Sequence, residues 1–296
     1  MAEADVLDKL AGIARDAGVT ASVHATRLAG EPMSVDLDGG APVAMASLYK
    51  LPLALAWADL VAAGETDDRM MVPLPAASRA PGPTGVSMLL DDVQLTARDV
   101  TRMMLALSDN SCADALMRVM GRDRVNEHLA ALGLTATVIR RSSRSSSRAV
   151  MRETGAPNPA EAERRLAHPD GAVETSQYDP ALSSASTARE LCQVLRLLWT
   201  RDSAPHKCVK DAMAAQPWRH RIGSGFPHDD VRVSGKTGTL VRLRHEGAVV
   251  EFPHEVPVAV TVLTRAVRPE RHLPRVDAAI GDLARTAVTA LRIPLD

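Results

Sequence analysis

The chain has 296 residues, of which 46% are hydrophobic and 24% are charged, as in an ordinary soluble globular protein with a sizeable core. A formal net charge of −1 argues against nucleic acid or a membrane surface as a partner, and 2% aromatic residues argue against base stacking. The first ten residues are acidic where a secretory signal is positively charged, and no apolar run reaches about 18 residues. We therefore expect a cytoplasmic protein with no membrane partner.

Metal and disulfide chemistry are also not indicated. Cys112, Cys192 and Cys208 are odd in number and scattered, which favours free thiols. The nine histidines show no paired metal-ligand spacing. We expect no metal and no cofactor. The oligomeric state stays open, with a monomer as the expectation.

Helical periodicity over residues 4–17 predicts an amphipathic first helix. Residues 19–28 and 33–37 alternate and are rich in β-branched residues, which predicts a hairpin. Ser47 and Lys50 then begin an almost entirely apolar run through Leu60. If this run is helical, residues three apart lie on one face, so the Ser47 hydroxyl and the Lys50 amine come within reach of a shared proton.

The middle of the chain is mostly helical in pattern. Residues 71–85 are rich in proline and predict a loop. A capping sequence at 96–99 starts a helix whose end presents Ser108, Asp109 and Asn110. Further helices are expected at 111–120, 125–132 and 187–199.

Residues 140–180 include a Ser/Arg-rich stretch and lack apolar periodicity. We interpret them as a long surface excursion, in the first place a solvated loop. A lid over the active-site cleft and a contact with an anionic partner remain as alternatives.

The end of the chain predicts strands at 231–243, 248–252 and 256–264, followed by a closing helix at 275–291. These elements indicate an α+β fold, with an antiparallel sheet flanked by the N- and C-terminal helices. Residues 1–46 and 205–296 would form the sheet lobe, residues 47–204 would form an inserted all-α lobe with the 140–180 excursion, and the two lobes would make one structural unit.

Three short sequence motifs, called strings below, follow one another along the chain: Ser47-x-x-Lys50, Ser108-Asp109-Asn110 and Lys236-Thr237-Gly238. Only five residues of the chain are lysine and thirty are arginine, yet two of the five lysines fall in these strings. A desolvated lysine can serve as a base, whereas arginine cannot. On these motifs, the chain resembles the class A serine β-lactamases and penicillin-recognising serine hydrolases over nearly its whole length.

The resemblance implies the role of each residue. Ser47 would be the nucleophile, Lys50 its base and Ser108 the proton carrier to the leaving group. Substrate binding would fall to Asn110 on the acyl side and to Lys236, Thr237, Gly238 and Thr239 on the strand. The backbone N–H groups of Ser47 and Thr239 would form the oxyanion hole, and Arg219 or Arg221 would add charge beside the substrate carboxylate.

One part of the family's machinery is absent from the pattern. Class A enzymes carry a Glu-x-x-Leu-Asn segment whose Glu activates the deacylating water, but this chain has Arg141-Ser-Ser-Arg-Ser145 at the corresponding place. Glu153, Glu161 and Glu163 lie in the excursion, and no pattern selects one of them as a substitute.

We therefore expect a β-lactamase-like serine hydrolase that forms a Ser47 acyl-enzyme with an amide or ester and is weak as a β-lactamase. Its substrate would be a small molecule with a carboxylate and a cyclic amide or ester. The alternatives are an acyltransferase or esterase of small-molecule biosynthesis and a catalytically silent binding protein of the same fold.

Overall fold

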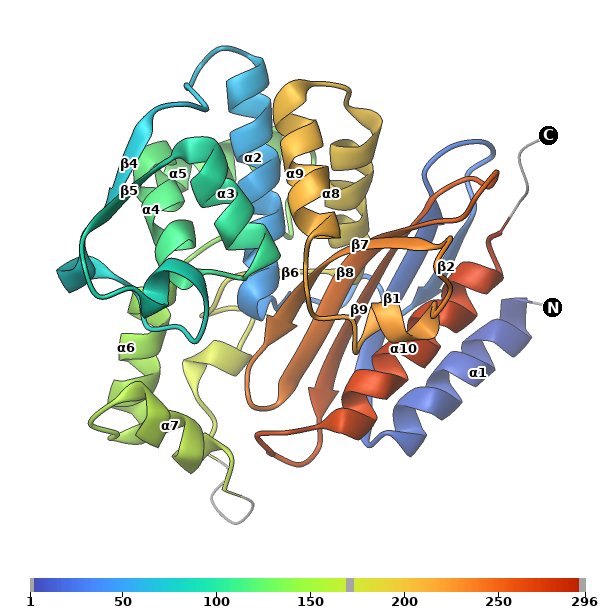
Figure 1. Ribbon diagram of the computed structural model, residues 1–296. Coiled ribbons are helices and arrows are strands. Elements are labelled where there is room, and N and C mark those ends of the chain that lie inside the picture. The colour runs from blue at the N-terminus through green and yellow to red at the C-terminus, as the bar shows by residue number, and fades with distance from the viewer. Residues whose placement is uncertain (1–2, 169–172, 293–296) are drawn as a thin grey trace.

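The structure is a computed structural model that describes residues 3–168 and 173–292 (Figure 1). Its centre is an antiparallel five-stranded sheet with the order β2-β1-β9-β8-β7. Helices α1 and α10 cover one face of the sheet, and the other helices lie on the opposite side. The bounds are Val19–Arg27 (β1), Ser34–Leu37 (β2), Arg232–Thr239 (β7), Leu243–Glu251 (β8), Val258–Ala266 (β9), Glu3–Asp16 (α1) and Pro274–Thr289 (α10).

The apolar side chains of the central strand β9 point alternately to the two faces of the sheet and so contribute to both hydrophobic cores. Val258, Val260 and Val262 are buried in the core shared with α1 and α10. Ala259 and Leu263 point the other way and are buried in the core of the helical lobe. Because successive side chains of a strand face opposite sides, one apolar strand holds both layers together.

The helical lobe is built around α2, which is buried on all sides from Lys50 to Ala58. A helix without a polar face is stable only inside such a core. The surrounding helices are Ala97–Ala106 (α3), Asn110–Met120 (α4), Arg122–Ala131 (α5), Ala188–Thr200 (α8) and Ala204–Ala214 (α9). The predicted α+β architecture is therefore confirmed.

Several local predictions were wrong. The expected loop at 71–85 begins with a strand that pairs with a second strand in the helical lobe, and α9 was not anticipated at all. The expected strand 231–243 is two strands, because the chain turns at 240–242. The additional elements are β3 (Val43–Ala44), β4 (Met71–Leu74), β5 (Val93–Thr96), β6 (Ala185–Ser186), and the 3-10 turns η2 (Ala76–Ser78), η3 (Gly85–Met88), η4 (Ser176–Tyr178) and η5 (Ile222–Gly225).

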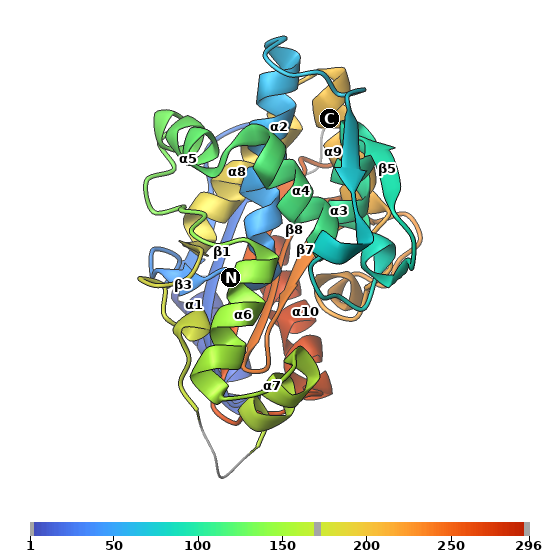
Figure 2. The same cartoon turned by 90° about the vertical axis from the view of Figure 1, so that its left-hand side faces the viewer.

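The 140–180 excursion is not a loop in its described part, and residues 169–172 of it lie outside the described residues. It contains helices α6 (Ser143–Thr154) and α7 (Pro159–Leu166), which are seen from the front in Figure 2. The Ser142 and Asn158 side chains cap these helices by accepting bonds from backbone N–H groups three residues on. Apolar burial is slight, because α6 buries only Ala149 and Val150. This small apolar face explains why the Ser/Arg-rich sequence did not predict a helix.

Helices on both sides of the predicted lobe boundary at residue 205 pack across it. Helix α8 contacts β1, β8 and β9, and α9 contacts α2, α3 and β7. The division into lobes stays a prediction. None of the helices in the described ranges combines the length and the hydropathy needed to span a bilayer.

Candidate active site

Ser47 lies in the 3-10 turn η1 (Ala46–Tyr49), immediately before α2 begins at Lys50. The expected single α-helix over both residues is therefore replaced by a tighter turn that leads into it. The preceding Ala46 has φ = 47°, a left-handed conformation that is strained for a residue with a side chain. Even so, the Lys50 Nζ atom is 3.4 Å from the Ser47 Oγ atom, which is the proximity that the spacing predicted.

Lys50 is fully buried, and burial lowers the pKa of its amine to about 7. Its Nζ atom donates to the Ser108 carbonyl oxygen at 2.6 Å and to the Asn110 Oδ1 atom at 2.8 Å. A neutral amine has two N–H donors and one lone pair. Because these two acceptors take both donors, the lone pair is left for the hydroxyl groups of Ser47 and Ser108, each 3.4 Å away.

Ser108 sits between the two motif lysines. Its Oγ atom accepts a hydrogen bond from Lys236 Nζ at 2.8 Å and lies 3.4 Å from Lys50 Nζ. Ser108 also has a left-handed backbone, with φ = 55°. The next residue, Asp109, is fully buried and caps α4 by accepting from the Cys112 N–H group at 2.9 Å. The helix start thus fixes the position of the Ser108 hydroxyl.

Strand β7 brings Lys236 to the site. Lys236 is fully buried, and burial together with the nearby Lys50 charge lowers the pKa of its amine. Glycine at position 238 permits close contact with the nucleophile turn, because an added Cβ atom would lie 2.9 Å from the Met45 carbonyl oxygen and 3.3 Å from the Leu48 nitrogen. The three distant strings therefore meet at one place.

Gln216 and Glu246 support the strand from behind and were not identified from the sequence. The Gln216 Oε1 atom accepts from the Thr237 N–H group at 2.9 Å and from the Thr237 hydroxyl at 3.2 Å. Its Nε2 atom donates to Glu246 at 3.0 Å. Glu246 is 1% exposed, and burial raises the pKa of its carboxyl. This chain of bonds holds Thr237 in place.

Of the two arginines proposed to flank the substrate carboxylate, Arg221 lines the cavity and Arg219 does not. The Arg221 Nη2 atom donates to the Thr239 hydroxyl oxygen at 2.8 Å, and its Nε atom donates to Asp277 at 2.7 Å. Since the Thr239 oxygen accepts from Arg221, its O–H proton remains available for an anion in the cavity.

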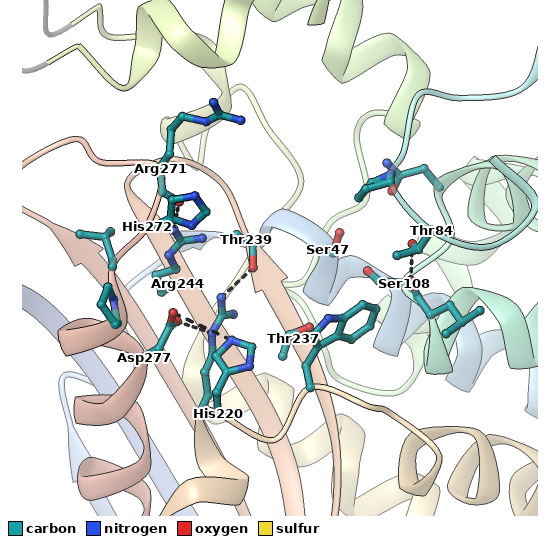
Figure 3. Close-up of a pocket in the computed structure, with 17 residues that line it drawn as sticks. Ser47, Thr84, Ser108, His220, Thr237, Thr239, Arg244, Arg271, His272 and Asp277 are labelled. Carbon is teal, nitrogen blue, oxygen red and sulfur yellow. Dashed lines mark hydrogen bonds and ion pairs between the residues drawn. The ribbon is translucent and has the colours of Figure 1, made fainter. Parts of the chain in front are cut away.

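A cavity of about 700 Å³ opens in front of these groups (Figure 3). Ser47, Ser108, Asn110, Thr237 and Thr239 line it, whereas Lys50 and Lys236 lie buried beneath. Further lining residues were not expected from the sequence, because each is isolated in its segment: Thr84, Trp218, His220, Arg244, Arg271, His272 and Asp277.

A second cavity of about 530 Å³ adjoins the first and shares Ser47, Asn110 and Thr239 with it. Helices α6 and α7 form its other wall, together with Arg141, which lies two residues before α6. The start of α6 is anchored near the nucleophile, because the Tyr49 hydroxyl bonds Ser143 Oγ at 2.7 Å. The excursion is thus a wall of the candidate active site.

The three glutamates that could have replaced the family's deacylating base differ in position. Glu153 accepts from Ser176, and Glu161 is paired with the two arginines that follow on α7. Only Glu163 lines the second cavity, where its Oε1 atom lies 3.5 Å from the Arg271 Nε atom. Within the described ranges, the acids that line either cavity are Glu163 and Asp277, and each is ion-paired with arginine.

The three cysteines are free, as expected. Cys112 follows Asn110 closely in sequence but is fully buried in the helical core, where burial raises the pKa of its thiol. A raised pKa keeps the thiol protonated and unreactive. Cys112 therefore serves packing.

Comparison with known proteins agrees with this arrangement. Residues 5–291 match the model of the β-lactamase enzyme family, Beta-lactamase2. The chain is 31% identical over 311 residues to the β-lactamase regulatory protein BlaB of Streptomyces cacaoi, with 97% of each chain covered. The chain belongs to the β-lactamase enzyme family, as the motifs indicated.

Solved structures share the fold. The β-lactamase of Sphaerobacter thermophilus superposes with a TM-score of 0.76 at 23% identity and covers 98% of each chain. A mutant of PBP-A, solved as an acyl-enzyme complex with penicillin G, superposes with a TM-score of 0.77 at 16% identity and covers 97% of this chain and 96% of its own. These likenesses establish a class A β-lactamase-like fold.

Proposed function

We propose that this protein is a serine hydrolase that forms an acyl-enzyme at Ser47 and releases it slowly. The observation that carries the proposal is the Lys50 amine, whose pKa is lowered to about 7 and whose Nζ atom lies 3.4 Å from the Ser47 Oγ atom. A base with a pKa near the working pH is the most effective proton acceptor. The PBP-A acyl-enzyme with penicillin G, which shares the fold, supports a β-lactam as the probe.

The steps follow from the positions of the groups. Lys50 takes the Ser47 proton, and the Ser47 oxygen attacks the carbonyl of a cyclic amide or ester. The backbone N–H groups of Ser47 and Thr239 stabilise the oxyanion, each donor contributing about 3 kcal/mol. Ser108, hydrogen-bonded to Lys236 at 2.8 Å, then gives its proton to the leaving nitrogen or oxygen and regains one from the Lys50 ammonium, whose Nζ atom is 3.4 Å from the Ser108 Oγ atom. A substrate carboxylate accepts from the hydroxyl of Thr239 and lies beside Arg221.

Release of the acyl group needs a base beside the attacking water. In the described part of the chain, the second cavity offers only Glu163 as an acid, and that carboxylate faces Arg271. Water is therefore activated poorly, and the acyl group persists or passes to another acceptor. This supports weak β-lactamase activity and keeps acyl transfer to a small molecule within the proposal.

Intact-mass spectrometry with benzylpenicillin tests the proposal. The wild-type protein should gain the mass of one penicillin and keep it after the free drug is removed, whereas Ser47→Ala should gain none. Ser146→Ala is the matched control, because Ser146 lines the second cavity without a place in the mechanism. Rapid loss of the added mass would contradict slow release of the acyl group. Labelling of Ser47→Ala would show that Ser47 is not the nucleophile.

A second function is favoured by the relative from Streptomyces cacaoi, which is described as a regulatory protein. On this alternative, the cavity binds a β-lactam-like ligand reversibly and the protein is catalytically silent. The same spectra separate the two functions. A silent binding protein shows no adduct with benzylpenicillin, while the drug still raises its melting temperature.

A further inference from the structure

The first cavity contains more positive than negative charge. Three guanidinium groups line it, those of Arg221, Arg244 and Arg271, and the one lining carboxylate in the described chain is that of Asp277, which pairs with Arg221. Arg271 lies 3.5 Å from Glu163 of the adjoining cavity, so the charge left without an ion pair is that of Arg244. Since buried charges in proteins are paired, this unpaired charge points to the charge of the ligand.

Arg221 is already satisfied by the protein. Its Nε atom bonds Asp277 at 2.7 Å, and its Nη1 atom donates to the carbonyl oxygens of Gly238 at 3.0 Å and His245 at 2.8 Å. Its Nη2 atom donates to Thr239. Asp277 neutralises its charge, so Arg221 mainly positions the Thr239 hydroxyl for a first carboxylate.

The charge of Arg244, unlike that of Arg221, is not balanced by an ion pair among the described residues. Arg244 is 6% exposed, yet the two acids that line the cavities in the described chain pair with other arginines, Asp277 with Arg221 and Glu163 with Arg271. The Arg244 Nη2 atom donates to the Arg271 carbonyl oxygen at 2.7 Å, and its buried Nε atom has no hydrogen-bond partner. An unpaired buried charge is costly, and burial together with Arg221 lowers the pKa of Arg244. An anionic ligand would remove this penalty.

Arg271 extends the same positive region toward solvent. Its side chain is 53% exposed and meets Glu163 only at 3.5 Å. Figure 3 shows Arg244 and Arg271 together on one side of the cavity, across Thr239 from Ser47. Both arginines also line the second cavity, so they lie where the two cavities meet.

We propose that Arg244 and Arg271 bind a second anionic group of the ligand, in addition to the carboxylate beside Thr239. The inference rests on the proposed function, because it places this group on a molecule whose carbonyl carbon is attacked by Ser47. The ligand is then a dianion, with a carboxylate or a phosphate as its second group. The planar fork of arginine suits either group, because it can donate two parallel hydrogen bonds.

Two penicillins that differ by one carboxyl group provide the test. Carbenicillin is benzylpenicillin with a carboxyl group added to its acyl side chain, and we expect this side chain in the second cavity, which Arg244 and Arg271 line. The second-order rate constant of acylation, measured by intact mass, should be about tenfold higher for carbenicillin, which corresponds to about 1.4 kcal/mol. In Arg244→Gln and in Arg271→Gln, the ratio of the two rate constants should fall toward one.

Arg275→Gln is the matched control, since Arg275 is exposed on α10 and lines neither cavity. It should keep the wild-type ratio. Arg271→Gln changes a half-exposed side chain, so it tests the inference even where Arg244→Gln does not fold. Equal rate constants for the two drugs in the wild type, or a preference that both variants retain, would overturn the second anion site.

Reversible binding to Ser47→Ala separates this inference from the proposed function. This variant cannot be acylated, so calorimetry with the two drugs measures recognition alone. Tighter binding of carbenicillin, lost when Arg244→Gln is added, supports the anion site even if the wild type forms no adduct. Equal binding of both drugs overturns the anion site, even if Ser47 is acylated.

Discussion

The two walls of the Ser47 cavity differ in the chemistry that they offer. The wall made by η1, α4 and β7 holds two buried lysines on either side of Ser108, with short hydrogen bonds. The wall made by α6 and α7 presents serine hydroxyls and apolar side chains, Arg141 lies just before α6, and Glu163 is the one acid of this wall among the described lining residues. On the proposed mechanism, attack on a carbonyl and release of the acyl group would therefore depend on separate segments. A chain can retain the first half of the reaction and lack the second.

Removing the base from the first wall should have the largest effect. Lys50→Met keeps the length of the side chain but removes the amine, so Ser47 loses its proton acceptor. We expect the rate constant of acylation by benzylpenicillin to fall about 10³-fold, within the range typical of general-base catalysis. Intact-mass time courses measure the rate constant.

Lys210→Met is the matched control for the loss of a lysine. Lys210 bonds the backbone carbonyl oxygens of Trp199 and Arg201, away from the cavity. The control should acylate at the wild-type rate. A Lys50→Met protein that is folded, as judged by thermal unfolding, and acylates normally would remove Lys50 from the mechanism.

Adding a carboxylate to the second wall should speed hydrolysis of the acyl-enzyme. By the resemblance drawn from the sequence, Arg141 would stand where class A enzymes have their glutamate, and it lines the second cavity. In Arg141→Glu, we expect the acyl-enzyme to be hydrolysed about tenfold faster, below the full general-base effect because the position of the new carboxylate is not optimised. The decay of the adduct mass gives the rate, and Arg141→Gln controls for loss of the positive charge. Equal decay in the two variants would show that position 141 does not reach the water.

Lowering the pH should slow acylation reversibly, because it charges the Lys50 amine of the first wall. The pKa of Lys50 is lowered to about 7, so the amine is mostly neutral above that pH and mostly charged below it. Acylation therefore slows as the pH falls, by about fivefold between pH 7 and pH 6, as the neutral fraction decreases. The measurement is the acylation rate constant from pH 5.5 to 8.5. A flat profile would contradict Lys50 as the base, and the residual rate of Lys50→Met should show no step near pH 7.

The first wall was largely predictable from the sequence, and the second was not. Ser47, Lys50, Ser108 and Lys236 belong to short strings whose local geometry is set by one turn, one helix start and one strand. The sheet and the terminal helices also follow from strong periodic patterns. The strings predicted that the three segments meet, although they do not fix the detailed geometry, such as the 3-10 turn at Ser47.

The residues that were missed have no local signal. Arg244 lies opposite Thr239 only because the chain turns at 240–242, and the strand was expected to continue through that turn. Arg271 lies in the segment before α10, Asp277 lies in the first turn of α10, and both reach the cavity through tertiary packing. Helices α6 and α7 depend on side-chain caps and on few apolar contacts, which a reading of hydrophobic periods does not detect.

The smallest expected change concerns the acid already present in the second wall. Glu163→Gln keeps the size of the side chain and removes its charge. Because Glu163 is half-exposed and paired with Arg271, we expect its charge to change the activation free energy of deacylation by less than about 1 kcal/mol, so the lifetime of the acyl-enzyme should change by less than about fivefold. Adduct decay measured beside Glu161→Gln, whose residue lines neither cavity, provides the comparison. A lifetime lengthened by tenfold or more would identify Glu163 as a deacylating base, and the contrast between the two walls would then be one of degree.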